Sequence, residues 1–203
     1  MKTELRIVAG SLRGRKLSVQ VSEDMRPTPQ MVREALFSIL GNAVPNRLFV
    51  DIFAGTGVNG MEALSRGAKG AFFIERDFSL ADAVLGHLKK FDLMKTAKLF
   101  RTDSYRWVSS FKAPREPINV FISPPFADLQ KRPEVLVDAI AQLQERVAPD
   151  SVIVLQSERG SPIDERPEFA SWERRTYGRN VLYLWQREEA VAPAAEEEAG
   201  RVE

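Results

Sequence analysis

Cysteine is absent from this 203-residue sequence, and histidine occurs once, as His87. The lack of thiols excludes disulfides and thiolate metal sites, and a single imidazole excludes a histidine-rich metal centre. No apolar stretch approaches the ~20 residues of a membrane-spanning helix, and the amino terminus shows no secretory pattern. These absences predict a cytoplasmic chain without a metal or a membrane partner. We also expect it to act as a monomer.

Net charge is small, but the value of +1 conceals a strong polarity along the chain. The first 33 residues carry seven Lys or Arg against three acids, whereas residues 188–203 carry six acids against one Arg. With 44% apolar residues, the chain can bury one substantial core. We predict a basic appendage in residues 1–25, one domain in residues 26–187 and an acidic, disordered tail in residues 188–203.

A short apolar run, residues 48–52, leads into a glycine-rich turn. Gly55, Gly57 and Gly60 fit the Gly-x-Gly-x-x-Gly spacing, in which missing side chains allow a tight turn, a close approach to a nucleotide and the start of a helix. The pattern predicts a buried strand, a loop that contains Phe53, and a helix. Glycines after a strand are also common turn residues, so this pattern alone leaves the function open.

Two carboxylates flank the glycine-rich turn in the sequence. Asp51 stands at an otherwise apolar strand end, where an unpaired charge is costly. We therefore expect it to meet a fixed donor or a charged ligand, or to stabilise the loop. Glu75 ends a second apolar run, twenty residues after Gly55, where a Rossmann-like site has an acid that accepts hydrogen bonds from ribose hydroxyls. The alternative for Glu75 is a solvated charge at a strand end.

Asp103 follows a third predicted strand, residues 98–101. Its carboxylate suits two roles equally: accepting a hydrogen bond from an adenine amino group, or capping a helix that begins near Ser104. The complete set of predicted cofactor-binding residues is Asp51, Phe53, Gly55, Gly57, Gly60, Glu75 and Asp103. This set suits an adenosine-containing cofactor and does not distinguish a dinucleotide from S-adenosylmethionine.

The tetrapeptide Ser123-Pro124-Pro125-Phe126 separates these two cofactors. It follows the apolar residues 118–122, so its prolines end a strand and fix a rigid loop at the carboxyl edge, which faces the ligand crevice in such folds. The tetrapeptide resembles the Asn/Asp/Ser-Pro-Pro-aromatic signature of methyltransferases that modify exocyclic amino groups of bases. The alternative is a proline-stiffened turn without a catalytic role.

Five further blocks narrow this resemblance. They are Arg6-Ile7-Val8-Ala9-Gly10, Arg13-Gly14-Arg15-Lys16-Leu17, Arg26-Pro27-Thr28-Pro29, Val32-Arg33-Glu34-Ala35-Leu36-Phe37 and Glu62-Ala63-Leu64-Ser65-Arg66. Over residues 4–187 the chain resembles the bacterial 16S rRNA guanine-N2 methyltransferase family. The resemblance implies S-adenosylmethionine as cofactor and a guanine of 16S rRNA, within an assembled 30S particle, as substrate. That family usually has Asp where this chain has Ser123.

The chemistry of a base amine suggests a role for each residue of this loop. The amine shares its lone pair with the ring and is a poor nucleophile until that conjugation is reduced. We expect the Ser123 hydroxyl and the Pro124 carbonyl to accept the amine hydrogens, while Pro125 stiffens the loop and Phe126 stacks on the extruded base. Two other functions stay open: an amino methyltransferase on adenine or another base, and a noncatalytic RNA-binding assembly factor.

The basic amino-terminal block predicts a β-hairpin, with strands at residues 5–9 and 16–21 around a glycine-containing tip. Its predicted RNA-binding residues, expected to contact phosphates, are Arg6, Arg13, Arg15 and Lys16. The alternative is a solvated, charged hairpin. The resemblance places Arg26 near the active site, so we add it to the RNA-binding set. Thr28 is expected to cap the helix that follows.

The alternation of strands and helices predicts a Rossmann-like fold: a seven-stranded, mostly parallel sheet with helices on both faces, plus the amino-terminal β-hairpin. Residues 172–177 and 181–186, separated by Gly178-Arg179-Asn180, are typical of an antiparallel hairpin that closes the sheet.

Overall fold

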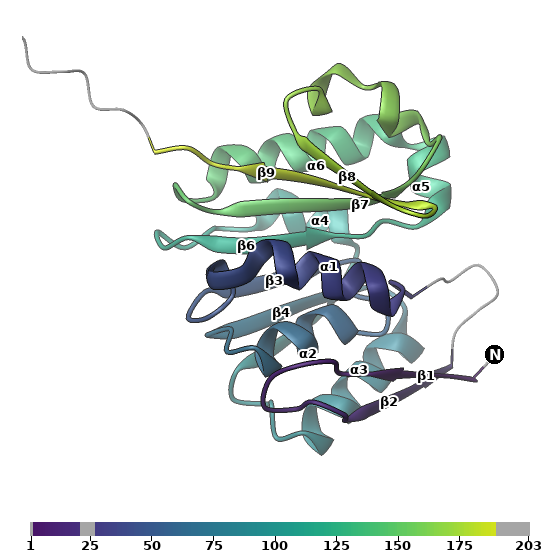
Figure 1. Cartoon of the computed structure of the whole chain (residues 1–203), viewed down its shortest axis with the longest axis vertical. Helices are drawn as coiled ribbons and strands as arrows, with labels where there is room; N and C mark the ends of the chain where they lie inside the picture. Colours follow the sequence, from purple (N-terminus) through teal and green to yellow (C-terminus); the bar gives the residue numbers. More distant parts are fainter. Residues whose placement is uncertain (1, 21–26, 190–203) are drawn as a thin grey trace, which may run out of the picture.

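One seven-stranded sheet forms the centre of the molecule (Figure 1). The computed structural model describes residues 2–20 and 27–189. The strands of this sheet are β3 (Leu48–Ile52), β4 (Gly70–Glu75), β5 (Ala97–Arg101), β6 (Ile118–Ile122), β7 (Val152–Glu158), β8 (Glu173–Tyr177) and β9 (Asn180–Gln186), in the order β5-β4-β3-β6-β7-β9-β8. Neighbours from β5 to β7 are parallel, whereas β9 runs antiparallel to β7 and β8. The predicted mostly parallel sheet and its closing hairpin are confirmed.

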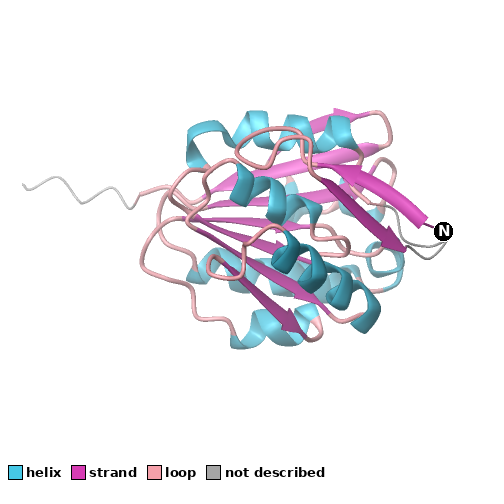
Figure 2. Ribbon diagram, turned by 90° about the horizontal axis from the view of Figure 1, so that it is seen from below, coloured by secondary structure: helices cyan, strands magenta, loops and turns pink. Residues whose placement is uncertain are grey.

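Helices cover both faces of the sheet (Figure 2). The helices on one face are α1 (Gln30–Leu40), α2 (Val58–Ser65) and α3 (Phe78–Lys90), and those on the other are α4 (Ser104–Ser110), α5 (Phe126–Lys131) and α6 (Pro133–Arg146). Short 3-10 turns, η1 (Gly41–Ala43), η2 (Pro162–Glu165) and η3 (Pro167–Phe169), complete the connections. The central strand β6 is buried at all five positions, because a strand covered on both sides has no solvent face.

Only Asn119 interrupts the apolar sequence of β6. It is buried, and its Nδ2 donates to the Ala43 carbonyl oxygen at 2.7 Å. Within the described part of the chain, no helix has the length and apolar content to cross a bilayer. The same residues contain no cluster of three or more His, Asp or Glu side chains that is placed to hold a metal ion. His87 lies beside the core, with its ring stacked on Phe91 at 5.9 Å.

The amino-terminal hairpin is confirmed, with shifted boundaries. Its strands are β1 (Lys2–Arg6) and β2 (Lys16–Gln20), paired antiparallel so that Leu5 lies opposite Leu17. Leu17, Val19 and Ile7 are buried in a cluster with side chains of α2 and α3. The first strand ends at Arg6 instead of the predicted residue 9, because Ile7 bonds to the hairpin loop at Gly14 and Arg15, and the backbone of Val8 and Ala9 bonds to α2.

These bonds come from polar side chains of α2. The fully buried Glu62 carboxylate accepts the backbone N–H groups of Val8 at 2.8 Å and Ala9 at 3.0 Å. Ser65 accepts the Leu12 N–H at 2.9 Å through its hydroxyl oxygen and donates to the Ala9 carbonyl at 2.5 Å. A β-carbon on Gly10 would lie 1.7 Å from the Ser65 carbonyl oxygen. The hairpin loop is therefore built against the end of α2.

A buried arginine extends this network to α1. Arg33 is 1% exposed; it donates from Nη2 to the Arg6 carbonyl oxygen at 2.8 Å and from Nη1 to the Thr28 carbonyl oxygen at 3.1 Å. Its Nε lies 3.9 Å from Oε2 of Glu62, whose Oε1 also accepts from Arg66 Nε at 2.9 Å. Two of the blocks that carry the family resemblance thus hold the amino-terminal hairpin against α1 and α2.

Candidate active site

The loop after β3 has the backbone conformation that its glycines predict. Phe53, Gly55 and Gly57 have φ values of 60°, 54° and 71°, all in the left-handed region. Gly57 then occupies the amino-terminal cap position of α2. Gly60 has a packing role, because a β-carbon there would lie 2.3 Å from the Phe73 ring. The strand, turn and helix predicted from this pattern are confirmed, and α2 is set closely on the sheet.

Asp51 lies beneath this loop and is fully buried. Its Oδ2 accepts the Gly60 N–H at 2.9 Å, so the predicted fixed donor exists. Its Oδ1 has no hydrogen-bond partner within the described residues. Burial raises the pKa of the Asp51 carboxyl to about 8, and the nearby charge of Glu75 acts in the same direction.

The raised pKa of Asp51 makes the stability of the cofactor-free protein fall as pH rises. Between an unfolded pKa of about 3.9 and a folded pKa of about 8, the folded state holds a proton that the unfolded state has lost. This contribution is complete at the acid end of the window and disappears towards pH 8. Asp51→Asn cannot ionise, so we expect it to flatten this part of the curve. Urea denaturation across the window measures it; parallel curves for the two proteins would contradict a protonated Asp51.

Glu75 ends β4 beside the glycine-rich loop. It is 8% exposed, and its two carboxylate oxygens accept the backbone N–H groups of Gly55 at 2.7 Å and Asp77 at 2.8 Å. The alternative of a solvated charge is therefore wrong. Each oxygen keeps a second lone pair. Glu75 is fixed at the carboxyl end of its strand, where the Rossmann-like pattern predicts an acidic side chain that binds the ribose hydroxyls.

Asp103 has the capping role that the sequence left open. It is the amino-terminal cap of α4, and its Oδ1 accepts from the backbone N–H groups of Tyr105 at 3.0 Å and Arg106 at 3.1 Å. Its Oδ2 lies 3.7 Å from Nη1 of Arg76. A contact with adenine stays a prediction, and it has to use the outer oxygen.

The Ser123-Pro124-Pro125-Phe126 loop follows β6, the sheet neighbour of β3. The Ser123 N–H donates to the Ile52 carbonyl oxygen at 3.3 Å, which joins this loop to the start of the glycine-rich turn. Pro125 occupies the cap position of α5, and Phe126 is the first residue of that helix. The Phe126 ring is 52% exposed. The loop is therefore tied to β3 at its first residue and to α5 at its end, and part of its aromatic surface is uncovered.

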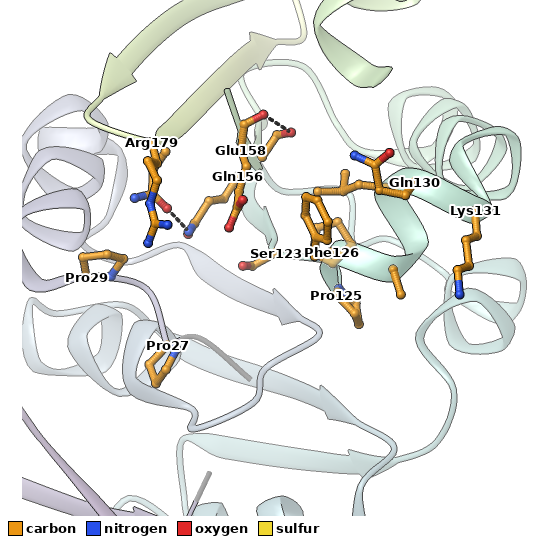
Figure 3. A pocket seen from close by; sticks show the side chains of 15 residues that line it. Pro27, Pro29, Ser123, Pro125, Phe126, Gln130, Lys131, Gln156, Glu158 and Arg179 are labelled. Carbon is orange, nitrogen blue, oxygen red and sulfur yellow. Dashed lines mark hydrogen bonds between the residues drawn. The ribbon is translucent and has the colours of Figure 1, made fainter. Parts of the chain in front are cut away.

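A pocket of about 730 Å³ opens beside this loop (Figure 3). Phe126, Gln130 and Lys131 of α5 form one wall, and Gln156 and Glu158 of β7 line it near its centre. The remaining wall comes from Pro27 and Pro29 before α1, from Arg179 in the β8–β9 turn and from Asn180 at the start of β9. Apart from Phe126, the residues from α5, β7 and this turn were not predicted as site residues, because they reach the pocket only through the tertiary fold.

A chain of polar contacts connects this pocket with α2. Thr28 Oγ1 donates to Gln156 Oε1 at 2.9 Å and accepts from Asn59 Nδ2 at 3.3 Å. Gln156 Nε2 donates to Asn180 Oδ1 at 3.0 Å. The prediction that Thr28 caps α1 was wrong: Pro29 holds the cap position without a side-chain bond, and the Thr28 hydroxyl bonds to β7 instead.

The predicted site residues fall into two groups in space. The predicted cofactor residues lie at the carboxyl ends of β3, β4 and β5, beside the proline loop at the end of β6. Arg13 and Arg15 are exposed, but their loop packs on the carboxyl-terminal end of α2, away from the glycine-rich turn where that helix begins. Arg6 and Lys16 are exposed on the hairpin strands, with Lys16 Nζ 2.8 Å from Glu4 Oε1. Arg26 lies outside the described residues.

The fold matches solved structures over nearly the whole chain. The structure of yhhF from Escherichia coli has a TM-score of 0.75 and 30% identity, covering 93% of this chain and 100% of that one. The Thermus thermophilus 16S rRNA N2 G1207 methyltransferase (RsmC), in complex with AdoMet and guanosine, has a TM-score of 0.69. It is 17% identical, and the match covers 93% of this chain and 50% of that one. Fold and site together define this chain as a Rossmann-like methyltransferase.

The sequence comparisons give the family. The family model described as "Conserved hypothetical protein 95" matches residues 5–186. Ribosomal RNA small subunit methyltransferase D of Escherichia coli strain K12 is 32% identical over 188 residues, which cover 91% of each chain. The enzyme of the same name from Haemophilus influenzae is also 32% identical, over 91% of this chain and 95% of that one. The chain belongs to this family, as the amino-terminal blocks predicted.

Proposed function

We propose that this protein transfers a methyl group from S-adenosylmethionine to the exocyclic N2 amine of a guanine in 16S ribosomal RNA. The observation that carries the proposal is the loop 123–126. It is fixed at the carboxyl end of β6, beside the glycine-rich turn, with the half-exposed Phe126 ring at a pocket of about 730 Å³. The relatives' names support a ribosomal substrate, and a structure of the same fold, named as a 16S rRNA N2 methyltransferase in complex with guanosine, supports a guanine as target.

The cofactor half of the proposal rests on the residues around β3 and β4. Gly55 and Gly57 let the backbone approach the ligand, and Glu75 has spare lone pairs for the ribose hydroxyls. The outer oxygen of Asp103 suits the adenine amine, and Phe53 adds an apolar surface next to the loop. The unpaired Oδ1 of the buried Asp51 is an acceptor for a polar group of the ligand or for water. When bound, S-adenosylmethionine supplies an electrophilic methyl group on a sulfonium.

The substrate half of the proposal rests on positioning. Phe126 stacks on the extruded base, and this interaction holds the amine against the loop. The Ser123 hydroxyl oxygen and the Pro124 carbonyl accept the two amine hydrogens, so the nitrogen lone pair turns out of conjugation and towards the methyl group. Orientation of this kind reaches effective molarities on the order of 10⁵ M, so a strong base is not required. The surplus amine proton leaves to water.

Serine at position 123 makes a specific kinetic prediction. An aspartate there accepts the guanine ring N–H as a charge-assisted hydrogen bond, roughly twice as strong as a neutral one. We therefore expect Ser123→Asp to keep or raise the rate of guanine methylation. The matched control is Ser171→Asp, an equal change of charge at an exposed serine outside the pocket. A large loss of rate in Ser123→Asp, with cofactor affinity intact, would contradict the role given to this side chain.

Transfer of labelled methyl groups tests the proposed function. The substrates are 30S particles and naked 16S rRNA from cells that lack this enzyme, and the product is digested to nucleosides. We expect labelled N2-methylguanosine. Labelled methyladenosine would replace the proposal by an adenine enzyme, and RNA binding without any labelled product would indicate a noncatalytic assembly factor. Comparing the two substrates shows whether the assembled particle is required.

A further inference from the structure

Two cations stand on opposite sides of the pocket. Arg179 belongs to the β8–β9 turn and Lys131 is the last residue of α5; Figure 3 shows Ser123 and Phe126 between them. Both residues are exposed, and no side chain in the two described ranges forms an ion pair or hydrogen bond with either. Glu158 is the only acid among the described residues that line the pocket. The lining therefore carries a net positive charge.

The unpaired state of Arg179 contrasts with that of its neighbours on β8. Arg174 Nη2 lies 3.4 Å from Asp164, and Arg175 Nη2 lies 2.5 Å from Glu173. Arg166, at the end of η2, pairs with Glu134 in the first turn of α6. Carboxylates thus hold Arg174, Arg175 and Arg166, whereas Arg179 and Lys131 have no such partner among the described residues and keep their donors available to a ligand.

The β8–β9 turn presents Arg179 from a fixed backbone. Gly178 has a φ of 59°, which allows the tight reversal, and the Arg179 carbonyl oxygen accepts the Arg159 N–H at 2.7 Å. The next residue, Asn180, accepts from Gln156 Nε2 of β7. Lys131 is placed by a helix whose Asp128 accepts a hydrogen bond from Tyr105 at 2.7 Å. A planar guanidinium that is held by a fixed backbone is suited to bind phosphate oxygens.

A base that leaves its stack needs its backbone held on both sides, because the extrusion rotates the nucleotide about its flanking phosphates. Phosphate contacts hold nucleic acid in register without reading its sequence. We infer that Arg179 and Lys131 bind the phosphates on the two sides of the target nucleotide, so that the RNA strand crosses the pocket between the β8–β9 turn and α5. This inference rests on the proposed function, in which the pocket receives an extruded guanine.

The inferred contact is separate from the amino-terminal hairpin. Figure 1 shows β1 and β2 beside α2 and α3, at the opposite end of the sheet from α5 and the β8–β9 turn. A short RNA that contains only the target nucleotide and its neighbours therefore engages Arg179 and Lys131. Contacts of the hairpin cations require a longer substrate.

Salt-dependent RNA binding tests the inference. The probe is a single-stranded 16S rRNA fragment that the wild type methylates, with S-adenosylhomocysteine present so that no turnover occurs. We expect Arg179→Ala and Lys131→Ala each to weaken binding and to reduce the slope of log affinity against log salt by ~0.7, the value for one phosphate contact on a single strand. The double variant should lose about twice that slope, and Arg179→Lys should restore most of it.

The control is Arg115→Ala. Arg115 is exposed in the connection before β6, at the other edge of the sheet from Ser123. It should leave the slope unchanged. The inference would be overturned if both alanine variants kept the wild-type slope, or if they lost only cofactor affinity or thermal stability. In either case, formation of N2-methylguanosine by the wild type would still uphold the proposed function. If the wild type forms N2-methylguanosine in neither 30S particles nor 16S rRNA, the proposed function fails and takes the inference with it.

Discussion

Replacing Phe126 with alanine is expected to lower kcat/KM for ribosomal RNA roughly 5- to 150-fold, because stacking of a base on an aromatic ring contributes about 1–3 kcal/mol. The ring is 52% exposed at the pocket and is the first residue of α5. Removing it leaves the cap of the helix and the glycine-rich turn in place. Cofactor affinity, measured by calorimetry, should therefore not change.

Two comparisons separate stacking from packing. Phe126→Tyr keeps a stacking face and should retain most of the activity. Met94→Ala removes another exposed apolar side chain, 45% exposed, which does not line the pocket, and should have no effect. If turnover by Phe126→Ala equals that of the wild type, the ring has no role in binding the base, and the assignment of the pocket to the substrate base loses its main support.

Replacing Glu62 with alanine is expected to lower the free energy of unfolding by about 3–5 kcal/mol, the usual cost of leaving one partner of a buried ion pair alone. The carboxylate has no exposed surface and accepts from Val8, Ala9 and Arg66. The substitution leaves these donors unsatisfied and the buried Arg33 without its counter-charge. Urea denaturation followed by fluorescence measures the loss.

The control for Glu62 is an exposed ion pair of similar length. Lys69 Nζ and Glu116 Oε2 are 2.6 Å apart, and both side chains are more than half exposed. Glu116→Ala should cost less than about 1 kcal/mol, because water and salt screen such pairs. Equal losses in the two variants would contradict a buried network between the hairpin and α2. Glu62→Ala should also expose the hairpin to limited proteolysis before the main domain unfolds.

The local part of the site was predictable from the sequence, because its signals are local. The glycine spacing predicts a tight turn after a strand. The two prolines predict the end of β6, because proline cannot donate a backbone hydrogen bond to a neighbouring strand. Asp103 remained open between two roles, since a cap and a ligand contact favour the same residue type. The structure shows the cap, and the ligand contact stays a prediction.

The rest of the site depends on partners that are distant in the sequence. Thr28 was assigned to a helix cap on local grounds, but its hydroxyl meets Gln156, 128 residues away. Glu62 contacts backbone groups 53 and 54 residues away, and no pattern near Glu62 signals this. Arg179 was noticed only as part of a turn, because the pocket exists only where α5, β7 and that turn come together.

The most direct measurement is mass spectrometry of nucleosides from 16S rRNA of cells that lack the gene for this protein. The account predicts that one N2-methylguanosine disappears, returns when the wild-type protein is expressed, and does not return to the full level with Phe126→Ala. An unchanged content of N2-methylguanosine in those cells, or loss of a methyladenosine instead, would contradict the assignment of a guanine amine as substrate.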